Sequence, residues 1–166
     1  MLHLASYKGP ASGLLHQLSH WLICHLKPRC WWPYLPALYS HNELVFSTCE
    51  DGLSQCASSS ARDGGVRVKW IDLNTGRWDV IPLPQYDDEQ SLQASYWFFR
   101  HAGEKYDYLG VAAFIKTLSA LVREVWNRWF CSEAIAAALG IKDPAKQSPQ
   151  ELHDLLAKPI NSNHPS

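Results

Sequence analysis

The chain has 166 residues, of which 46% are hydrophobic, enough for one domain with a sizeable apolar core. Its 15 lysine and arginine residues nearly balance its 16 aspartate and glutamate residues, so bulk charge does not favour a nucleic-acid partner. No stretch reaches the roughly 18 apolar residues that span a bilayer, and the N-terminus lacks the features of a signal peptide. We therefore expect one domain over residues 1–158 and a disordered tail over 159–166, in a cytoplasmic or virion-associated protein.

A first amphipathic helix is predicted over residues 13–26, because leucines recur there at helical spacing. The stretch "KPRCWWPYLP" then ends it, since its three prolines cannot continue a helix. Tryptophan beside Lys and Arg also suits a membrane surface, but a loop packed over a sheet explains the same residues. We do not expect membrane contact.

A metal site was weighed on this predicted helix. His16, His20 and Cys24 share one of its faces, and histidine and cysteine are zinc ligands. Three ligands spread over two helical turns cannot all reach one ion at about 2.1 Å without distortion, so we expect no metal and no cofactor. The five cysteines are an odd number without a CxxC pair, which leaves at least one thiol free and favours reduced cysteines.

Four strands are predicted next, from the segments "HNELVFST", "LSQCASS", "VRVKWIDL" and "RWDVIPL". The turn signals "CEDG", "ARDGG" and "NTG" separate them and are too short for crossover helices, so the strands should form an antiparallel meander.

Helical patterns follow the strands, over residues 87–103, 106–129 and 131–139, with Gly140 closing the third. A last short helix is predicted from "SPQELHDLLAK", where Ser148 and Glu151 match a capping box and Pro149 takes the first helical position. The order of elements predicts an α+β domain with an N-terminal helix and a small antiparallel sheet of about four to five strands.

The candidate nucleophile is Cys131, at the first turn of the Ala-rich helix "CSEAIAAALG". Unpaired backbone N–H groups at a helix N-terminus favour an anion, which makes a thiolate available. Small residues at positions 134, 137 and 138 would let this helix approach a sheet closely. A nucleophilic cysteine needs a base, and His41, at the start of the first predicted strand, is the candidate.

The stretches "YSHNELVF", "DGGVRV", "GEKYDYLG" and "WFCSEAIAAALG", in this order, resemble the circularly permuted papain-like cysteine hydrolases. These belong to the NlpC-like superfamily, in its YiiX-like and lecithin:retinol acyltransferase-like branch, where the histidine strand precedes the cysteine helix. The resemblance covers roughly residues 38 to 140. It implies a permuted papain-like fold, Cys131 as nucleophile and His41 as general base, and Tyr106 matches a tyrosine that helps to bind the oxyanion.

The third, orienting group departs from the family pattern, because the strand after the histidine, "LSQCASSS", has no acid. Gln55 on that strand could hold the imidazole through its amide. Glu43, two residues from His41 and so on the same strand face, is the other candidate. The residues alone do not choose between them.

We expect a thiol hydrolase that cleaves an amide, isopeptide or ester bond through a Cys-His acyl-enzyme. The resemblance implies cell-wall peptides or isopeptides as substrates, with lipid esters or amides second. The alternative is a non-catalytic binding or structural module, for instance a phage or effector accessory, that retains the fold without turnover.

Overall fold

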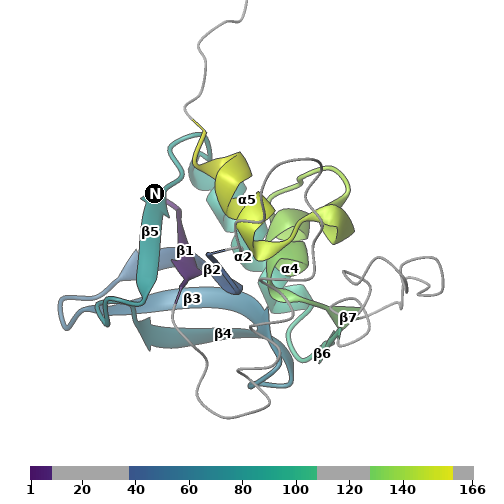
Figure 1. Ribbon diagram of the computed structural model, residues 1–166, viewed down its shortest axis with the longest axis horizontal. Coiled ribbons are helices and arrows are strands. Elements are labelled where there is room, and N and C mark those ends of the chain that lie inside the picture. The colour runs from purple at the N-terminus through teal and green to yellow at the C-terminus, as the bar shows by residue number, and fades with distance from the viewer. Residues whose placement is uncertain (9–37, 108–127, 159–166) are drawn as a thin grey trace, which may run out of the picture.

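The computed structural model describes residues 1–8, 38–107 and 128–158. Seven strands form one sheet in the order β5-β1-β2-β3-β4-β6-β7, which curves into a half-barrel (Figure 1). All neighbours are antiparallel except β6 and β7, which are parallel. The strands are β1 (His3–Tyr7), β2 (His41–Thr48), β3 (Leu53–Ser60), β4 (Gly65–Asp72), β5 (Trp78–Pro82), β6 (Lys105–Tyr106) and β7 (Arg128–Trp129).

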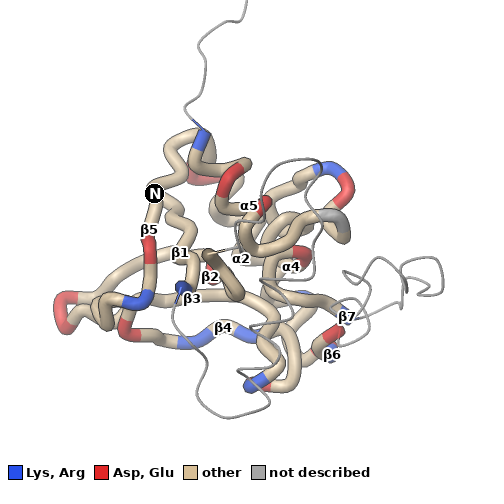
Figure 2. Tube along the Cα trace, in the orientation of Figure 1, with Lys and Arg blue, Asp and Glu red and all other residues tan. Residues whose placement is uncertain are grey.

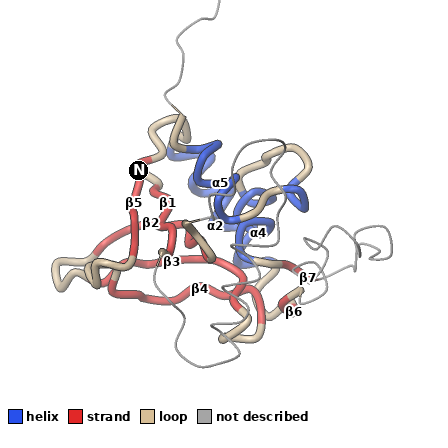
Figure 3. The backbone as a smooth tube through the Cα atoms, in the orientation of Figure 1, coloured by secondary structure: helices blue, strands red, loops and turns tan. Residues whose placement is uncertain are grey.

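The described residues also form three short α-helices and one 3-10 helix: α2 (Asp88–Arg100), α4 (Cys131–Ala138), η1 (Pro144–Lys146) and α5 (Pro149–Leu156). Figure 3 shows the helices gathered on one side of the curved sheet. In the described part of the chain, no helix is long and apolar enough to cross a membrane.

The predicted fold class is wrong. The permuted papain-like prediction had an N-terminal helix and a sheet of about four to five strands, whereas the chain begins with strand β1 and builds a seven-stranded mixed sheet. The segment "HLASY" is short and carries no turn signal of its own. It becomes a strand because it pairs with both β2 and β5. The two-residue strands β6 and β7 likewise exist only through pairing, which local sequence does not reveal.

The four predicted strands and three of the predicted helices are confirmed. The first predicted strand matches β2, and the others match β3, β4 and β5 to within a few residues. The predicted meander holds for β2, β3 and β4 but is wrong for β5, which pairs with β1. Helix α2 starts after Asp87, whose side chain accepts from the backbone N–H of Gln90, and α5 has the expected capping box between Ser148 and Glu151.

Other predictions fall wholly or partly outside the described residues. The first predicted helix, the His16–His20–Cys24 pattern and the tail 159–166 lie there entirely. Of the predicted helix 106–129, the structure describes only the two ends, and the prediction of helix is wrong at both. Tyr106 belongs to β6, and Arg128 and Trp129 form β7.

The main apolar core lies between the sheet and its helices. Alternate residues of β1 and β2, among them Leu4 and Leu44, pack there against Phe98 of α2, Ile135 of α4 and Leu152 of α5. The opposite side chains form a second, smaller cluster on the other face of the sheet, made of Ala5, Val45, Cys56 and Leu73. His41 and Glu43 share a face of β2 with Val45, so they belong to this second face.

Candidate active site

Cys131 is the first residue of α4, and the chain just before it is held in place. The Ser59 hydroxyl, at the end of β3, donates to the Trp129 carbonyl at 2.6 Å. The Phe130 N–H, at the N-cap, donates to the Glu133 carboxylate at 3.4 Å. These contacts fix the N-terminus of α4 against the sheet, and Cys131 is only 2% exposed.

His41 is the first residue of β2, and its side chain contacts Cys131 and Glu43. The Cys131 thiol lies near enough to the ring to raise the pKa of the imidazole. The ring Nε2 lies 2.8 Å from Glu43 Oε1. The His41 side chain is 24% exposed, whereas that of Glu43 is 1% exposed. The imidazole therefore bridges a buried carboxylate and the thiol at the start of a helix.

The electrostatics of this cluster favour a protonated His41. Burial by itself lowers the pKa of His41, but the charge and hydrogen bond of Cys131, followed by those of Glu43, outweigh burial and raise the pKa to about 10. An imidazolium beside a cysteine sulfur is the arrangement that stabilises the thiolate form of a nucleophile.

Arg67 on β4 holds Glu43 through both carboxylate oxygens. Its Nη1 donates to Glu43 Oε2 at 2.7 Å, and its Nη2 donates to Oε1. Burial alone would raise the pKa of Glu43, but the hydrogen bonds and charges of Arg67 and His41 outweigh it and lower the pKa. The carboxylate is therefore ionised and has both oxygens engaged, which restricts its rotation.

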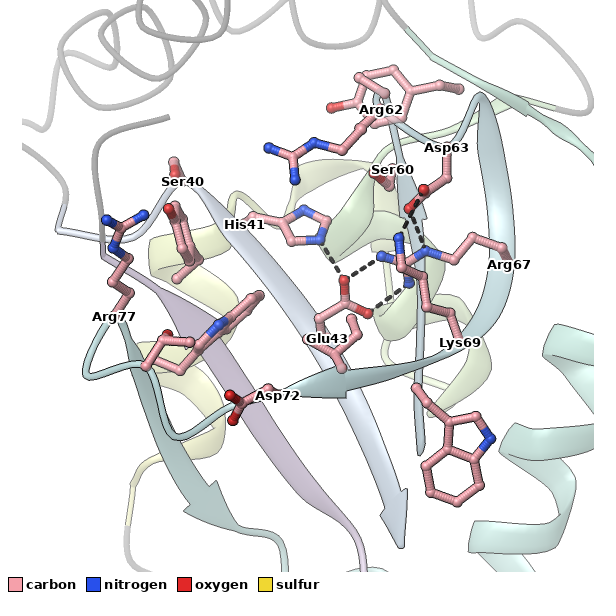
Figure 4. Close-up of a pocket in the computed structure, with 17 residues that line it drawn as sticks. Ser40, His41, Glu43, Ser60, Arg62, Asp63, Arg67, Lys69, Asp72 and Arg77 are labelled. Carbon is pink, nitrogen blue, oxygen red and sulfur yellow. Dashed lines mark hydrogen bonds and ion pairs between the residues drawn. The ribbon is translucent and has the colours of Figure 1, made fainter. Parts of the chain in front are cut away.

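The network continues to the turn between β3 and β4 (Figure 4). Asp63 accepts from Arg67 Nε at 2.8 Å and from Lys69 Nζ at 3.0 Å. Burial acts to raise the pKa of Asp63, but its two cationic partners lower the value to about 2. Asp63 thus orients the guanidinium that in turn orients Glu43.

The structure places the other two candidate residues differently. Tyr106 is buried and packs with Phe130 and Cys131 in one small cluster, so it lies at the site. Gln55 pairs with Ser47, far along β2 from His41. Of the two candidates for the third group, Glu43 contacts the imidazole and Gln55 sits elsewhere on the sheet.

Arg67, Asp63 and Lys69 escaped the sequence analysis. The available signal was the alternation of Arg67 and Lys69 in "VRVKW", which puts two cations on one strand face, with Asp63 in the preceding turn. That pattern is also typical of a solvated strand. The pattern indicates a site only once the strand order is known. Strand β3 lies between β2 and β4, and Arg67 reaches across Ser58 of β3 to Glu43 of β2.

A pocket of about 680 Å³ opens beside these residues. His41, Glu43, Arg67 and Tyr106 line it, together with aromatic side chains that include Tyr7 and Trp78. The Trp78 ring meets the His41 ring edge-on, with centroids 6.3 Å apart. The imidazole therefore faces a space large enough for part of a peptide or a small acyl compound.

Comparison with known proteins finds no matching family model, no matching curated protein and no matching solved structure. The resemblance to the NlpC-like hydrolases therefore stays a prediction. The chemical interpretation of the site rests on its own geometry.

Proposed function

We propose that the protein is a thiol hydrolase that cleaves an amide or ester bond through a Cys131 acyl-enzyme. The observation that carries the proposal is the chain of contacts from Cys131 through His41 to Glu43, with the Glu43 carboxylate held by Arg67. A nucleophile, a base and an orienting group in contact are what covalent acyl transfer requires.

In the first half-reaction the Cys131 thiolate attacks the carbonyl carbon of the substrate. A C–S bond forms and the carbonyl electron pair moves to oxygen. As this tetrahedral intermediate collapses, the C–N or C–O bond breaks and the His41 imidazolium protonates the leaving amine or alcohol. The product of this step is a thioester on Cys131 beside a neutral imidazole.

In the second half-reaction water releases the acyl group. Neutral His41 takes a proton from the water as its oxygen adds to the thioester carbonyl. Collapse then breaks the C–S bond, the carboxylic acid leaves, and the thiolate–imidazolium pair is restored. Glu43 stays ionised throughout and stabilises the imidazolium, which makes it a positioning residue.

The negative charge that develops on the substrate oxygen needs donors. The first hydrogen bond within the backbone of α4 runs from the Ala134 N–H to the Phe130 carbonyl, so the N–H of Cys131 lies before the helical ladder begins. We assign this N–H to the oxyanion, together with the hydroxyl of Tyr106, which packs beside Cys131 and lines the pocket.

Alkylation by iodoacetamide at pH 6, mapped by mass spectrometry, tests the nucleophile. We expect Cys131 to react at least about tenfold faster than a free-thiol peptide, because an ordinary thiol is almost fully protonated at this pH. The exposed Cys49 serves as an internal reference, and the buried Cys56, whose pKa is raised to about 12 mainly by burial, should stay unmodified.

Two controls sharpen the experiment. His41→Gln should slow alkylation of Cys131 because it removes the imidazolium that stabilises the thiolate, and unfolding in urea should remove the advantage of Cys131 altogether. If folded Cys131 reacts no faster than Cys49 or the peptide, the hydrolase proposal fails and a non-catalytic binding module becomes the better description.

A further inference from the structure

Some of the charged side chains that line the pocket have hydrogen-bond or ion-pair partners, and others do not. Four cations and three acids contribute to the lining: Arg62, Arg67, Lys69, Arg77, Glu43, Asp63 and Asp72. Arg67 and Lys69 are committed to Glu43 and Asp63, and the Asp72 carboxylate accepts from the backbone N–H of Asn74 at 2.8 Å. Among the lining cations, this leaves Arg62 and Arg77 without such an ion pair.

Within the described ranges, the guanidinium groups of Arg62 and Arg77 have no hydrogen bond or ion pair, and both residues are exposed. Figure 2 shows basic positions on β4 and next to the start of β5, among acidic positions elsewhere on the sheet. A guanidinium offers a planar fork of hydrogen-bond donors that matches a carboxylate. Two guanidinium groups without an ion-pair partner at a pocket can therefore bind an anion.

Both arginines line the same pocket as His41, and each is a chain neighbour of a residue near the site. Arg62 follows Ala61, which packs against the cluster that contains Cys131. Arg77 precedes Trp78, whose ring meets the His41 imidazole edge-on. Figure 4 shows the two guanidinium groups on different sides of His41, with Arg62 nearer the β3–β4 turn and Arg77 beyond Ser40.

We propose that the substrate of the proposed hydrolase is an acyl compound bearing a carboxylate, which Arg62 and Arg77 bind beside the scissile bond. The inference rests on the proposed function and names its substrate class. A guanidinium binds a carboxylate through two parallel hydrogen bonds, which suits a carboxylate to these two side chains. The Tyr7 and Trp78 rings, packed edge-on with centroids 4.9 Å apart, give the acyl chain an apolar wall.

Two alkylating reagents of nearly the same size test this inference. Iodoacetate carries a carboxylate where iodoacetamide carries a neutral amide, and with either one the Cys131 thiolate displaces iodide as a C–S bond forms. The measured quantity is the ratio of the two rate constants at Cys131, divided by the same ratio for a free-thiol peptide. We expect this normalised ratio to exceed one, and to fall when 0.5 M NaCl screens the charges.

The arginine variants separate these two side chains from the imidazolium, which also attracts an anion. Arg62→Gln and Arg77→Gln should each lower the normalised ratio by about threefold, the order of effect expected when one partly screened charge is removed. The double variant should lower it further. Arg100→Gln, on the exposed surface of α2 and outside the pocket lining, is the matched control and should leave the ratio unchanged.

The outcomes distinguish this inference from the function on which it rests. If Cys131 reacts rapidly with iodoacetamide but the double variant keeps the wild-type ratio within twofold, the carboxylate site is wrong and the hydrolase proposal stands. If Cys131 is slow with both reagents, the proposed function fails and takes the carboxylate site with it.

Discussion

At the scale of single residues, the raised pKa of His41 is due first to Cys131 and then to Glu43, a carboxylate two positions away in the same strand. Glu43 lies at hydrogen-bonding distance from the imidazole because alternate strand residues share a face, and its burial prevents water from screening the pair. Arg67 completes the arrangement by occupying both oxygens of the carboxylate.

Glu43→Gln should lower the pKa of His41 from about 10, because it removes a negative charge that stabilises the imidazolium. The fall in the rate of Cys131 alkylation by iodoacetate at alkaline pH, where the imidazolium charge is lost, should therefore move to lower pH, and an NMR titration of His41 should show the same direction of change. Gln55→Ala is the matched control, since Gln55 lies far along the sheet, and should leave both curves in place. A shift with Gln55→Ala but none with Glu43→Gln would reverse the assignment of the third group.

At the scale of elements, the N-terminus of α4 can bring Cys131 close to the sheet because the side chains on the buried face of the helix are small. Ala134 and Ala136 are completely buried, whereas Ala137 and Ala138 are only partly buried. Of the three expected small packing residues, Ala134 is in the main core and Ala138 packs against it, whereas Ala137 does not belong to this core and Ala136, which was not expected, does. Helical periodicity alone left the orientation of α4 about its axis undetermined.

Ala136→Leu should reduce the free energy of unfolding by about 1–3 kcal/mol, because the added atoms must displace packed neighbours in the main core. Ala137→Leu, one position along and partly exposed, should change it by less than about 0.5 kcal/mol. Urea unfolding followed by circular dichroism compares the two. If both variants lose the same free energy of unfolding, the close approach of α4 to the sheet does not account for the cost of the larger side chain.

The contact between β4 and β6 depends on a single glycine. Gly65 has φ +155°, and a Cβ there would meet the Glu104 carbonyl oxygen at 1.9 Å. Gly65 pairs with Lys105, the neighbour of Tyr106, so this close approach also places the tyrosine at the site.

Gly65→Ala should lower the free energy of unfolding by more than about 2 kcal/mol, since it combines a clash with an unfavourable backbone conformation. It should also slow alkylation of Cys131 if the displaced β6 disturbs the site. Gly64→Ala is the control: its φ is +85° with nothing near the added atom, so it should cost only about 1 kcal/mol. Similar costs for the two substitutions would mean that β6 can shift without penalty.

At the scale of the whole molecule, the ionic network ties β2 and β4 to the turn between β3 and β4. Glu43 and Asp63 both have a lowered pKa in the folded protein, and Arg67 contacts both. A group with a lowered folded pKa contributes stability above its unfolded pKa and loses that contribution as the pH falls through its folded pKa.

The free energy of unfolding should therefore decrease as the pH falls below about 4.5, the ordinary value for Glu43, and continue to decrease towards the pKa of about 2 for Asp63. Arg67→Met should flatten this acid slope, because it removes the cation that lowers both values. Denaturant titrations at several pH values measure the slope. Parallel slopes for the wild type and Arg67→Met would indicate that other carboxylates govern acid unfolding.

The elements whose signals are local were predictable from the sequence. The strands that match β2 to β5, the capped start of α2, the capping box of α5 and the beginning of a helix at Cys131 all follow from alternation, turn residues and capping side chains within a few positions. The same local rules placed His41 and Glu43 on one strand face before any fold was known.

Only the tertiary structure decided the sheet and the composition of the site. Strands β6 and β7 are only two residues long and β1 lacks turn signals of its own, so none of the three is recognised without its pairing partners, and the predicted architecture was therefore wrong. The choice of Glu43 over Gln55, and the presence of Arg67 behind it, depend on which strands are neighbours and how their registers align. Register is set by long-range pairing and core burial, and these are properties of the folded chain as a whole.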